Sequence, residues 1–285
     1  MTFEAMIPEI EKSGINLYGM AFYRNGEITE HRFQPASNCH NCYSIAKAFA
    51  MTAVGMLYDD GLIDVKKPIC HYMSSLIPAD ADPAWQLITV EHALTHKIGY
   101  GEGFLDIDVE DVNAYPTKDY LDMVFHHKLT HLPGQQYQYS DAAYYLVSRL
   151  ISAVSGEKAD VFLNRRLFQP MGFSEVAWSH CPQDYPMGAT GLYISATDMV
   201  KLGALYLQGG VWKGQRLLSE DWVHRAIANE YELRAKSAAG LIGKGGMYGQ
   251  QMLFNCEKNF AIAWHTHAPG EQIKALIDFI DKELD

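Results

Sequence analysis

Residues 39–50, CHNCYSIAKAFA, lead into the helix that decides the fold, and they carry two overlapping chemical patterns. Cys39 and Cys42 have the C-x-x-C spacing of a redox dithiol or of half a zinc site. Ser44 and Lys47 have the S-x-x-K spacing of a serine nucleophile and a lysine base. The two pairs share no residue, so the surrounding sequence has to indicate which pair carries the chemistry.

The segment after Ser44 favours the S-x-x-K pair. From Ile45 to Tyr58 the chain reads IAKAFAMTAVGMLY, which is apolar on every face and predicts a helix buried on all sides, with Lys47 as its only charge. Because desolvation penalises a buried ammonium, the lysine must be paired or lose its proton, and either state keeps the amine available for chemistry. Ser44 and Lys47 share one face of the first turn, where free backbone N–H groups and the helix dipole stabilise a developing alkoxide.

The competing patterns have less support. A second S-x-x-K lies at Ser155–Lys158, where Gly156 ends a predicted helix and the neighbours are polar, which indicates a surface coincidence. The remaining cysteines form no second C-x-x-C that would complete a zinc site, so we expect Cys39 and Cys42 to be small packing residues. A thiol-redox or metal-binding protein that uses these two cysteines is the less favoured alternative.

Composition and charge narrow the range of partners. The 285 residues are 48% hydrophobic, enough for a substantial core, and 34 acidic against 23 basic residues give a net charge of −11. That charge disfavours nucleic acid or membrane as a partner and favours a small-molecule ester, amide or peptide substrate. The start, MTFEAMIPEIEKSG, lacks a signal-peptide pattern and no stretch has the length of a membrane helix, so we expect a cytoplasmic protein. Five cysteines in a long chain predict reduced thiols.

Strands are predicted near both ends of one continuous domain, residues 1–285. After a short helix that ends near Ser13-Gly14, Ile15–Tyr23 and Glu27–Phe33 predict two strands joined across Asn25-Gly26, a strong hairpin signal. The patterns further predict helices over Ser44–Asp60, Ala142–Val154, Ala159–Phe168 (stopped by Pro170) and Thr197–Leu207, strands over Met247–Phe254 and Phe260–His265, and a final helix over Glu271–Leu284.

This order predicts the α/β class, with an antiparallel sheet built from both termini and flanked by helices, and with an inserted all-α subdomain. We expect the α/β part to comprise approximately residues 1–70 and 190–285, and the helical subdomain approximately residues 71–189. No repeat, low-complexity tract or linker divides the chain further.

Two later motifs supply candidate partners for Ser44. In LPGQQYQYSDAAYYLVSRLISAVSG, Tyr139-Ser140-Asp141 stands directly before a helix, where Ser140 or Asp141 makes a natural N-cap and the tyrosine is a candidate proton shuttle. In LIGKGGMYGQQMLF, Lys244-Gly245-Gly246 stands at the entry to a predicted strand, where glycines let a ligand approach the backbone.

The order S-x-x-K, then Y-S-D, then K-G-G resembles the penicillin-recognising serine hydrolases, and most closely the class C β-lactamase branch with its related esterases and DD-peptidases. The segments CYSIAKAFAMTAVGMLYDDGLI, ITVEHALTHKIGYG, GLYISATDMVKLGALYLQGG and LLSEDWV resemble that family in the same order, over nearly the whole chain. The resemblance implies a β-lactamase/transpeptidase-like fold and an active site in a cleft beside the helical subdomain.

The resemblance also implies roles for single residues. Ser44 would be the nucleophile, Lys47 the base, and Tyr139 the group that carries a proton to the leaving group and later activates water. Lys244 would supply positive potential. The oxyanion hole would consist of the backbone N–H groups of Ser44 and of Met247, which follows Gly246. The family implies no metal and no organic cofactor.

Two departures from the class C pattern bear on the substrate. Asp141 stands where class C enzymes have asparagine, and a carboxylate that reaches Lys47 favours its ammonium form and shifts the role of base towards Tyr139. Gly245 replaces the hydroxyl residue that helps hold a β-lactam carboxylate, and K-G-G resembles the W-G-G of some esterases of this fold. We therefore expect an ester or small amide as substrate. A penicillin-binding or sensor-like protein that acylates with little turnover is the alternative.

Other residues near the motifs carry weaker expectations. Tyr100, Phe104 and Tyr248 are candidates for the wall of an acyl pocket. His96 lies in the loop ITVEHALTHKIGYG, and no direct catalytic role is expected for it.

Overall fold

A computed structural model describes residues 1–35 and 37–284, which form two compact units. The sheet unit comprises the described residues of Met1–Ile45, Pro170–Ala177 and Leu192–Asp285, and the helical unit comprises Ala46–Gln169 and Trp178–Gly191. Ser44 therefore belongs to the sheet unit and Lys47 to the helical unit. The domain boundaries expected from the sequence remain a prediction.

One six-stranded antiparallel sheet organises the sheet unit, in the order β2-β1-β11-β10-β9-β8. Its strands are β1 (Leu17–Arg24), β2 (Glu27–Arg32), β8 (Arg234–Ala235), β9 (Leu241–Gly245), β10 (Gln251–Asn255) and β11 (Phe260–Thr266). The hairpin across Asn25-Gly26 joins β1 to β2, and β1 pairs with β11 from the other end of the chain. The predicted α/β class, with an antiparallel sheet built from both termini, is confirmed.

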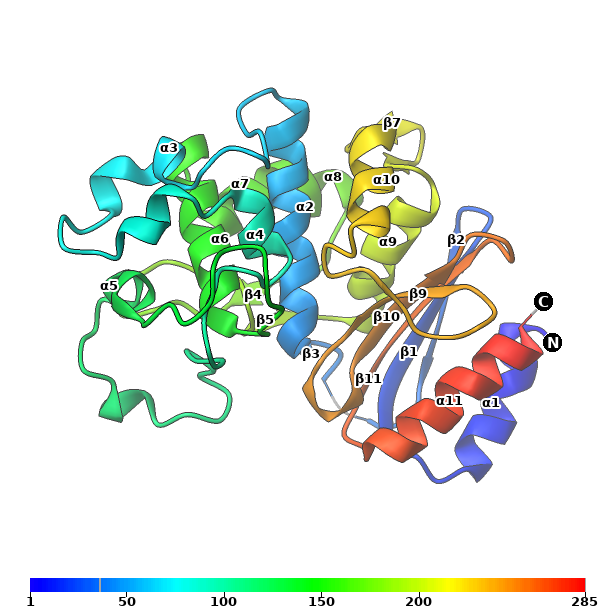
Figure 1. The fold of residues 1–285 in the computed structure, drawn as a ribbon. Helices are drawn as coiled ribbons and strands as arrows, with labels where there is room; N and C mark the ends of the chain where they lie inside the picture. Colours follow the sequence, from blue (N-terminus) through cyan, green and yellow to red (C-terminus); the bar gives the residue numbers. More distant parts are fainter. Residues whose placement is uncertain (36, 285) are drawn as a thin grey trace. The chain divides into compact units, whose positions relative to one another are not determined.

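Helices cover both faces of this sheet. Helices α1 (Phe3–Lys12) and α11 (Gly270–Glu283) lie together on one face of the sheet (Figure 1). Their apolar side chains share a core with alternate residues of β1 and β11. Helix α9 (Ala196–Leu207) packs on the other face. A Cβ at Gly203 would lie 3.3 Å from the Cβ of Ala261, so the missing side chain lets α9 approach β11 closely.

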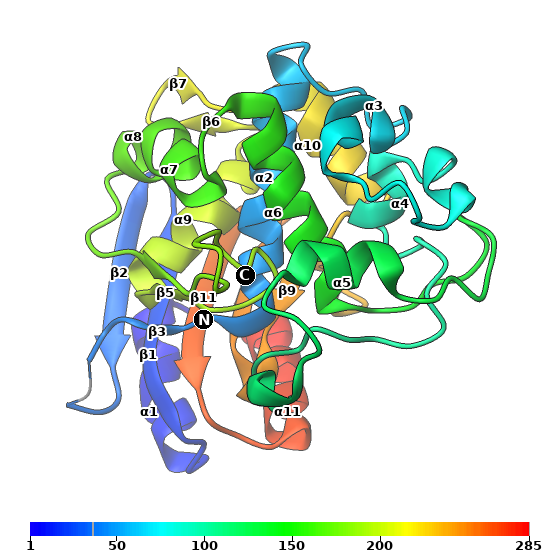
Figure 2. The same ribbon diagram turned by 90° about the vertical axis from the view of Figure 1, so that its left-hand side faces the viewer.

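The helical unit is built around α2 (Ala46–Asp59) and α6 (Asp141–Ser155), which lie side by side (Figure 2). Twelve of the fourteen residues of α2 are buried, as its uniformly apolar sequence predicts. Helix α6 ends at Gly156, which has a φ of 73° and so adopts the left-handed conformation typical of a glycine C-cap.

The remaining elements are short. They are β3 (His40–Asn41), η1 (Tyr43–Ile45), α3 (Cys70–Met73), η2 (Ser74–Leu76), η3 (Pro83–Gln86), α4 (Val90–Leu94), η4 (Val112–Ala114), α5 (Tyr120–His126), α7 (Ala159–Leu163), η5 (Asn164–Phe168), α8 (Gln169–Met171), β4 (Ala177–Trp178), β5 (Leu192–Ile194), β6 (Val211–Trp212), β7 (Gln215–Arg216), α10 (Glu220–Ala228) and η6 (Met247–Gly249). Within the described part of the chain, no helix is both long and apolar enough to cross a membrane.

Two predicted boundaries are wrong. Lys244 and Gly245 end β9 and do not lead into a strand, because Met247–Gly249 form the turn η6 before β10 begins at Gln251. Pro170 does not stop the helix before it, since α8 follows η5 directly and the proline lies inside it. The proline lies where the helical run changes from the π-helical turn η5 to α8, a kind of junction that accommodates a missing backbone hydrogen bond.

Candidate active site

Ser44 lies on η1, the 3₁₀ turn that leads directly into α2. The turn is held from both sides: the Cys42 N–H donates to the Leu192 carbonyl at 2.8 Å, and the Tyr43 N–H donates to Asn41 Oδ1 at 2.8 Å. Tyr43 has a φ of 50°, a strained conformation for a bulky residue. Such strain persists only where surrounding contacts enforce it, and it is concentrated at functional sites.

Lys47 lies on the first turn of α2 and is completely buried, but its charge is compensated. Its ammonium is 2.8 Å from the carboxylate of Asp141 and donates to the Ala189 carbonyl at 3.0 Å. It also lies 4.7 Å from the ring centroid of Tyr139, within cation–π range. The helical unit thus brings together three of the residues that the sequence predicted for the site: Lys47, Tyr139 and Asp141.

His96 holds the segment around Tyr139 at two points. The His96 carbonyl accepts the Gln138 N–H at 2.8 Å, and its Nδ1 accepts the Ser140 N–H at 3.2 Å. The imidazole also lies against the Tyr139 ring, with 4.5 Å between centroids and 34° between planes. Because Nδ1 is an acceptor, the ring is neutral and carries its proton on Nε2. His96 itself is buried and has a φ of 56°.

A second loop, which contains Gly103 and Phe104, also contacts the segment around Tyr139. A Cβ at Gly103 would lie 2.6 Å from the Tyr139 carbonyl oxygen, so only glycine fits there. The Phe104 N–H donates to Ser140 Oγ at 3.3 Å, and the Phe104 carbonyl accepts the Ala142 N–H at 3.2 Å. Contacts to both the backbone and the side chains therefore hold the Tyr139-Ser140-Asp141 turn in one conformation. A group that transfers a proton needs such a preorganised position.

Two further carboxylates lie close to Asp141. One oxygen each of Asp106, Asp108 and Asp141 lies within 4.8 Å of the others. Burial, and then the negative charge of Asp141, raise the pKa of Asp106. Carboxylate oxygens are ligands for hard divalent cations. We assign no metal to this cluster, because Lys47 already compensates Asp141 and Thr190 donates a hydrogen bond to Asp108.

The K-G-G motif lies in the sheet unit, next to the turn that carries Ser44. A Cβ at Gly246 would lie 2.4 Å from the Cys42 carbonyl oxygen, so the end of the motif packs directly on the residue two positions before Ser44. The ammonium of Lys244 pairs with the carboxylate of Glu232, which is almost completely buried. Lys244 therefore contributes less free positive potential than its sequence position suggested, because a buried carboxylate compensates it.

The cysteines show no sign of a reactive pair. None of the five is joined in a disulfide, and Cys42 is buried beside η1. Burial, together with the charges of Glu175 and Asp198, raises the pKa of Cys39. A redox or metal-binding thiol requires a lowered pKa, so this environment disfavours the C-x-x-C interpretation.

The predicted site residues thus fall into two groups. The helical unit holds Lys47, Tyr139 and Asp141, and the sheet unit holds Ser44, Lys244, Gly246 and Met247. Sequence reasoning missed the supporting roles of His96 and Glu232. In the sequence, the loop around His96 is indicated only by its resemblance to the family, and no pattern marks Glu232 as the partner of Lys244.

Comparisons with known proteins show the family and the fold. The family model for beta-lactamase matches residues 18–282. The 6-aminohexanoate-dimer hydrolase of Paenarthrobacter ureafaciens is 24% identical over 216 residues, which cover 73% of this chain and 53% of that protein. The chain spans about half the length of two curated relatives that it matches, 53% and 54%.

Solved structures share the fold. A Bacillus anthracis protein provisionally assigned as a 6-aminohexanoate-dimer hydrolase superposes with a TM-score of 0.79 at 15% identity, covering 100% of this chain and 83% of that one. A D-stereospecific amidohydrolase from Streptomyces superposes with a TM-score of 0.71 at 17% identity, covering 98% of this chain and 99% of that one.

Proposed function

The chain belongs to the beta-lactamase family, and on that premise we propose that it is a serine hydrolase that forms an acyl-enzyme on Ser44 and releases the acyl group to water. One observation carries the proposal: Lys47, the only buried charge of α2, lies three residues after Ser44, is paired with Asp141 and lies over the ring of Tyr139. A buried ammonium with this partner set is costly to maintain, because taking two charges out of water carries a large desolvation penalty. Perturbed and buried charges of this kind are typical of catalytic sites.

In the acylation step, Ser44 Oγ attacks the carbonyl carbon of an ester or amide and loses its proton. Asp141 favours the ammonium form of Lys47, so we assign the proton to the Tyr139 oxygen and give Lys47 the role of stabilising negative charge there. Tyr139 then donates this proton to the leaving alcohol or amine as the bond between carbonyl carbon and leaving group breaks. In deacylation it takes a proton from water, the hydroxide attacks, and the proton returns to Ser44.

The developing oxyanion needs hydrogen-bond donors, and we assign the backbone N–H groups of Ser44 and Met247. The close packing of Gly246 on the Cys42 carbonyl supports this assignment, because it holds the two backbone segments against each other in the sheet unit. The N–H of Gly246 donates to the Gln250 carbonyl at 2.8 Å, so the next N–H in the chain is the better candidate.

The substrate is proposed to be a neutral ester or small amide. Gly245 provides no hydroxyl group, and Lys244 is paired with Glu232, so a substrate carboxylate would find little free charge at the K-G-G motif. The names of two similar proteins, a 6-aminohexanoate-dimer hydrolase and a D-stereospecific amidohydrolase, describe amide substrates of those proteins. A second candidate is a penicillin-binding protein with little turnover, favoured by the Asp141 carboxylate that keeps Lys47 charged and leaves deacylation to Tyr139 alone.

A hydrolysis panel tests this function. Release of product is measured for short-chain esters, small amides and a penicillin, with the unaltered protein, Ser44→Ala and Ser155→Ala. Ser155 belongs to the other S-x-x-K and serves as the matched control. We expect steady ester or amide hydrolysis that is lost in Ser44→Ala and kept in Ser155→Ala. Equal hydrolysis by all three proteins would refute the assignment of Ser44.

A further inference from the structure

A pocket of about 290 Å³ lies in the sheet unit beside the turn that carries Ser44. Six aromatic rings dominate its wall: Tyr18, His40, Tyr43, Tyr193, Tyr248 and His267. Among the described residues that line it, none is an aspartate, glutamate, lysine or arginine. The wall of the pocket therefore combines aromatic rings with the polar side chains of Cys39, Asn41, Gln250 and Thr266, and its described residues include no carboxylate, lysine or arginine.

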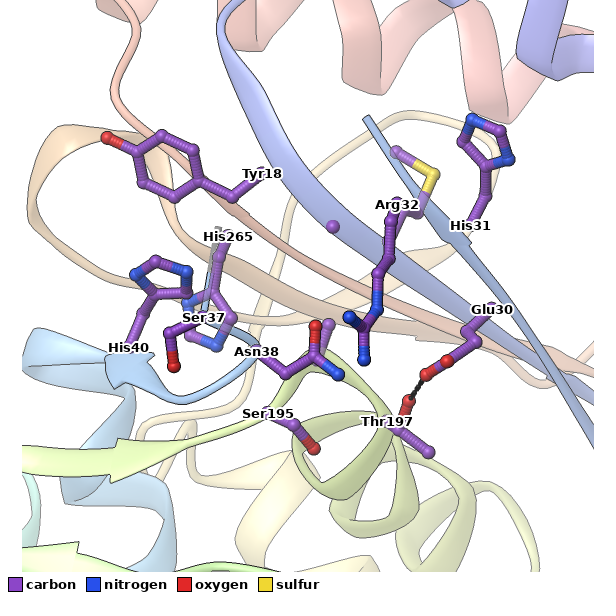
Figure 3. A pocket seen from close by; sticks show the side chains of 13 residues that line it. Tyr18, Glu30, His31, Arg32, Ser37, Asn38, His40, Ser195, Thr197 and His265 are labelled. Carbon is purple, nitrogen blue, oxygen red and sulfur yellow. Dashed lines mark hydrogen bonds between the residues drawn. The ribbon is translucent and has the colours of Figure 1, made fainter. Parts of the chain in front are cut away.

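The rings are already packed on one another. The Tyr248 ring stacks on His267 at 4.4 Å with 13° between planes, and it meets Tyr43 edge-on at 5.4 Å and 73°. Tyr18 stacks on His40 at 4.7 Å, and the two side chains are seen next to each other in Figure 3, where they also line a neighbouring smaller cavity. These are the offset-stacked and edge-to-face arrangements that aromatic rings prefer, and a further ring can extend them.

Two residues of this pocket, Tyr43 and Tyr248, have a strained backbone and are direct neighbours of the predicted oxyanion donors. Tyr43 immediately precedes Ser44 and has a φ of 50°, and Tyr248 immediately follows Met247 and has a φ of 58°. Both are bulky residues in the left-handed region, where glycine or asparagine would be more stable. Each strained residue contributes its ring to the pocket and stands next to a predicted oxyanion donor. The same two turns thus shape the pocket and orient the backbone N–H groups.

The residues that line the pocket favour an aromatic ligand over an anion or a cation. A carboxylate would find no lysine or arginine to pair with, because none is among the described residues that line the pocket and the nearby Lys244 is paired with Glu232. A cation needs free ring faces, whereas one face each of Tyr248 and Tyr18 is used by a histidine. Tyr193 and Tyr248 are 39% and 42% exposed as whole residues, which leaves surface for a ligand to cover. A cavity of about 150 Å³ already accommodates a benzene ring, so this pocket has sufficient space.

We infer that this aromatic pocket receives an uncharged aryl group of the ester or amide substrate. The inference rests on the proposed hydrolase function and adds the substrate class to it. An aryl group held here would lie beside the two turns that carry the predicted oxyanion donors, so its binding would align the scissile carbonyl with them.

Binding can be tested without turnover in Ser44→Ala protein. Ligand-detected NMR titrations measure the dissociation constants of benzyl alcohol, cyclohexylmethanol, benzylamine and benzoate. We expect benzyl alcohol to bind most tightly, with at least fivefold weaker binding after Tyr193→Ala or Tyr248→Asn and little change after Tyr193→Phe, which keeps the ring. Asparagine tolerates the positive φ of Tyr248. The inference would be overturned if benzylamine, benzoate or cyclohexylmethanol bound more tightly than benzyl alcohol. It would also be overturned if all variants bound benzyl alcohol equally well.

A kinetic comparison separates this inference from the function on which it rests. With Ser44 intact, the ratio of kcat/KM for benzyl acetate to that for methyl acetate is measured in the unaltered protein, Tyr193→Ala and Tyr193→Phe. We expect at least a fivefold lower ratio in Tyr193→Ala only. An unchanged ratio in all three proteins contradicts the aryl pocket but leaves the hydrolase intact. Absence of any ester hydrolysis contradicts the hydrolase, and the binding titrations still decide the pocket.

Discussion

The ammonium of Lys47 lies 2.8 Å from the carboxylate of Asp141, with both side chains removed from solvent. Class C β-lactamases, which this sequence resembles, have asparagine at the position of Asp141. A full negative charge at this distance favours the ammonium form of the lysine, which makes Lys47 an electrostatic partner of Tyr139 more than a base. This pair therefore decides how the proton moves in the proposed reaction.

Replacement of Asp141 by asparagine tests that role. Asparagine keeps an oxygen that can accept from Lys47 but removes the negative charge that compensates it, so the Lys47 ammonium stabilises negative charge on Tyr139 more strongly. We expect Asp141→Asn to retain the fold and to move the acidic limb of the pH–rate profile to lower pH. The measurement is kcat/KM for a short ester across pH 5 to 9. An unchanged profile would contradict the proposed influence of Asp141 on Lys47.

Asp141→Leu is the matched control, since it removes both charge and acceptor. It leaves the Lys47 ammonium buried without its carboxylate, which costs about 3–5 kcal/mol of the free energy of unfolding. Chemical denaturation measures the loss. A change below about 1 kcal/mol would show that Lys47 is not held as a buried ammonium.

His96 provides a second prediction, because its ring and its Nδ1 can be altered separately. In His96→Asn, Oδ1 can take the place of Nδ1 as acceptor for the Ser140 N–H, and asparagine tolerates the positive φ. In His96→Phe the ring against Tyr139 remains but the acceptor is lost. We expect kcat to fall by about a hundredfold in His96→Phe and much less in His96→Asn, because misplacement of a catalytic group has costs of that size.

The measurement for the two His96 variants is whether the substitution changes kcat or KM. A positioning residue for Tyr139 changes kcat and leaves KM nearly constant, because the tyrosine acts in the chemical step. Melting temperatures of both variants report any loss of fold. Equal kcat in His96→Phe and the unaltered protein would show that the hydrogen bond to Ser140 has no influence on catalysis.

Asp106 gives a prediction on stability against pH. Burial and the neighbouring Asp141 raise its pKa above the ordinary aspartate value, so the folded state binds this proton more tightly than the unfolded state does. The ionised carboxylate is therefore unfavourable in the fold at neutral pH. We expect Asp106→Asn to raise the free energy of unfolding at pH 7, with a gain that disappears as the pH falls to about 4. A gain that grows on acidification would contradict the sign.

Much of the fold was predictable because it depends on local patterns. The Asn25-Gly26 hairpin, the uniformly apolar α2 and the Gly156 cap each have a physical signal within a few residues. The order of the motifs likewise identified Lys47, Tyr139 and Asp141, which the helical unit brings together.

The remainder depends on contacts between distant residues or on strained backbone. Glu232 compensates Lys244 although twelve positions separate them and no periodic pattern links them. Tyr43 and Tyr248 adopt positive φ angles that their residue types disfavour. Because Tyr248 lies within η6, the sequence predicts a strand where the structure has this turn. Local propensity cannot reveal such features, because tertiary contacts enforce them.

The most direct test of the central claim is the location of the acyl group. The protein is mixed with an activated short-chain ester, quenched in acid within the first turnovers, digested, and the peptides are analysed by mass spectrometry. We predict one acyl mass increment on the peptide that contains Ser44, absent in Ser44→Ala and present in Ser155→Ala. The account would be contradicted if the acyl increment lay on Cys39, Cys42 or any residue other than Ser44, and if both the increment and undiminished hydrolysis persisted in Ser44→Ala.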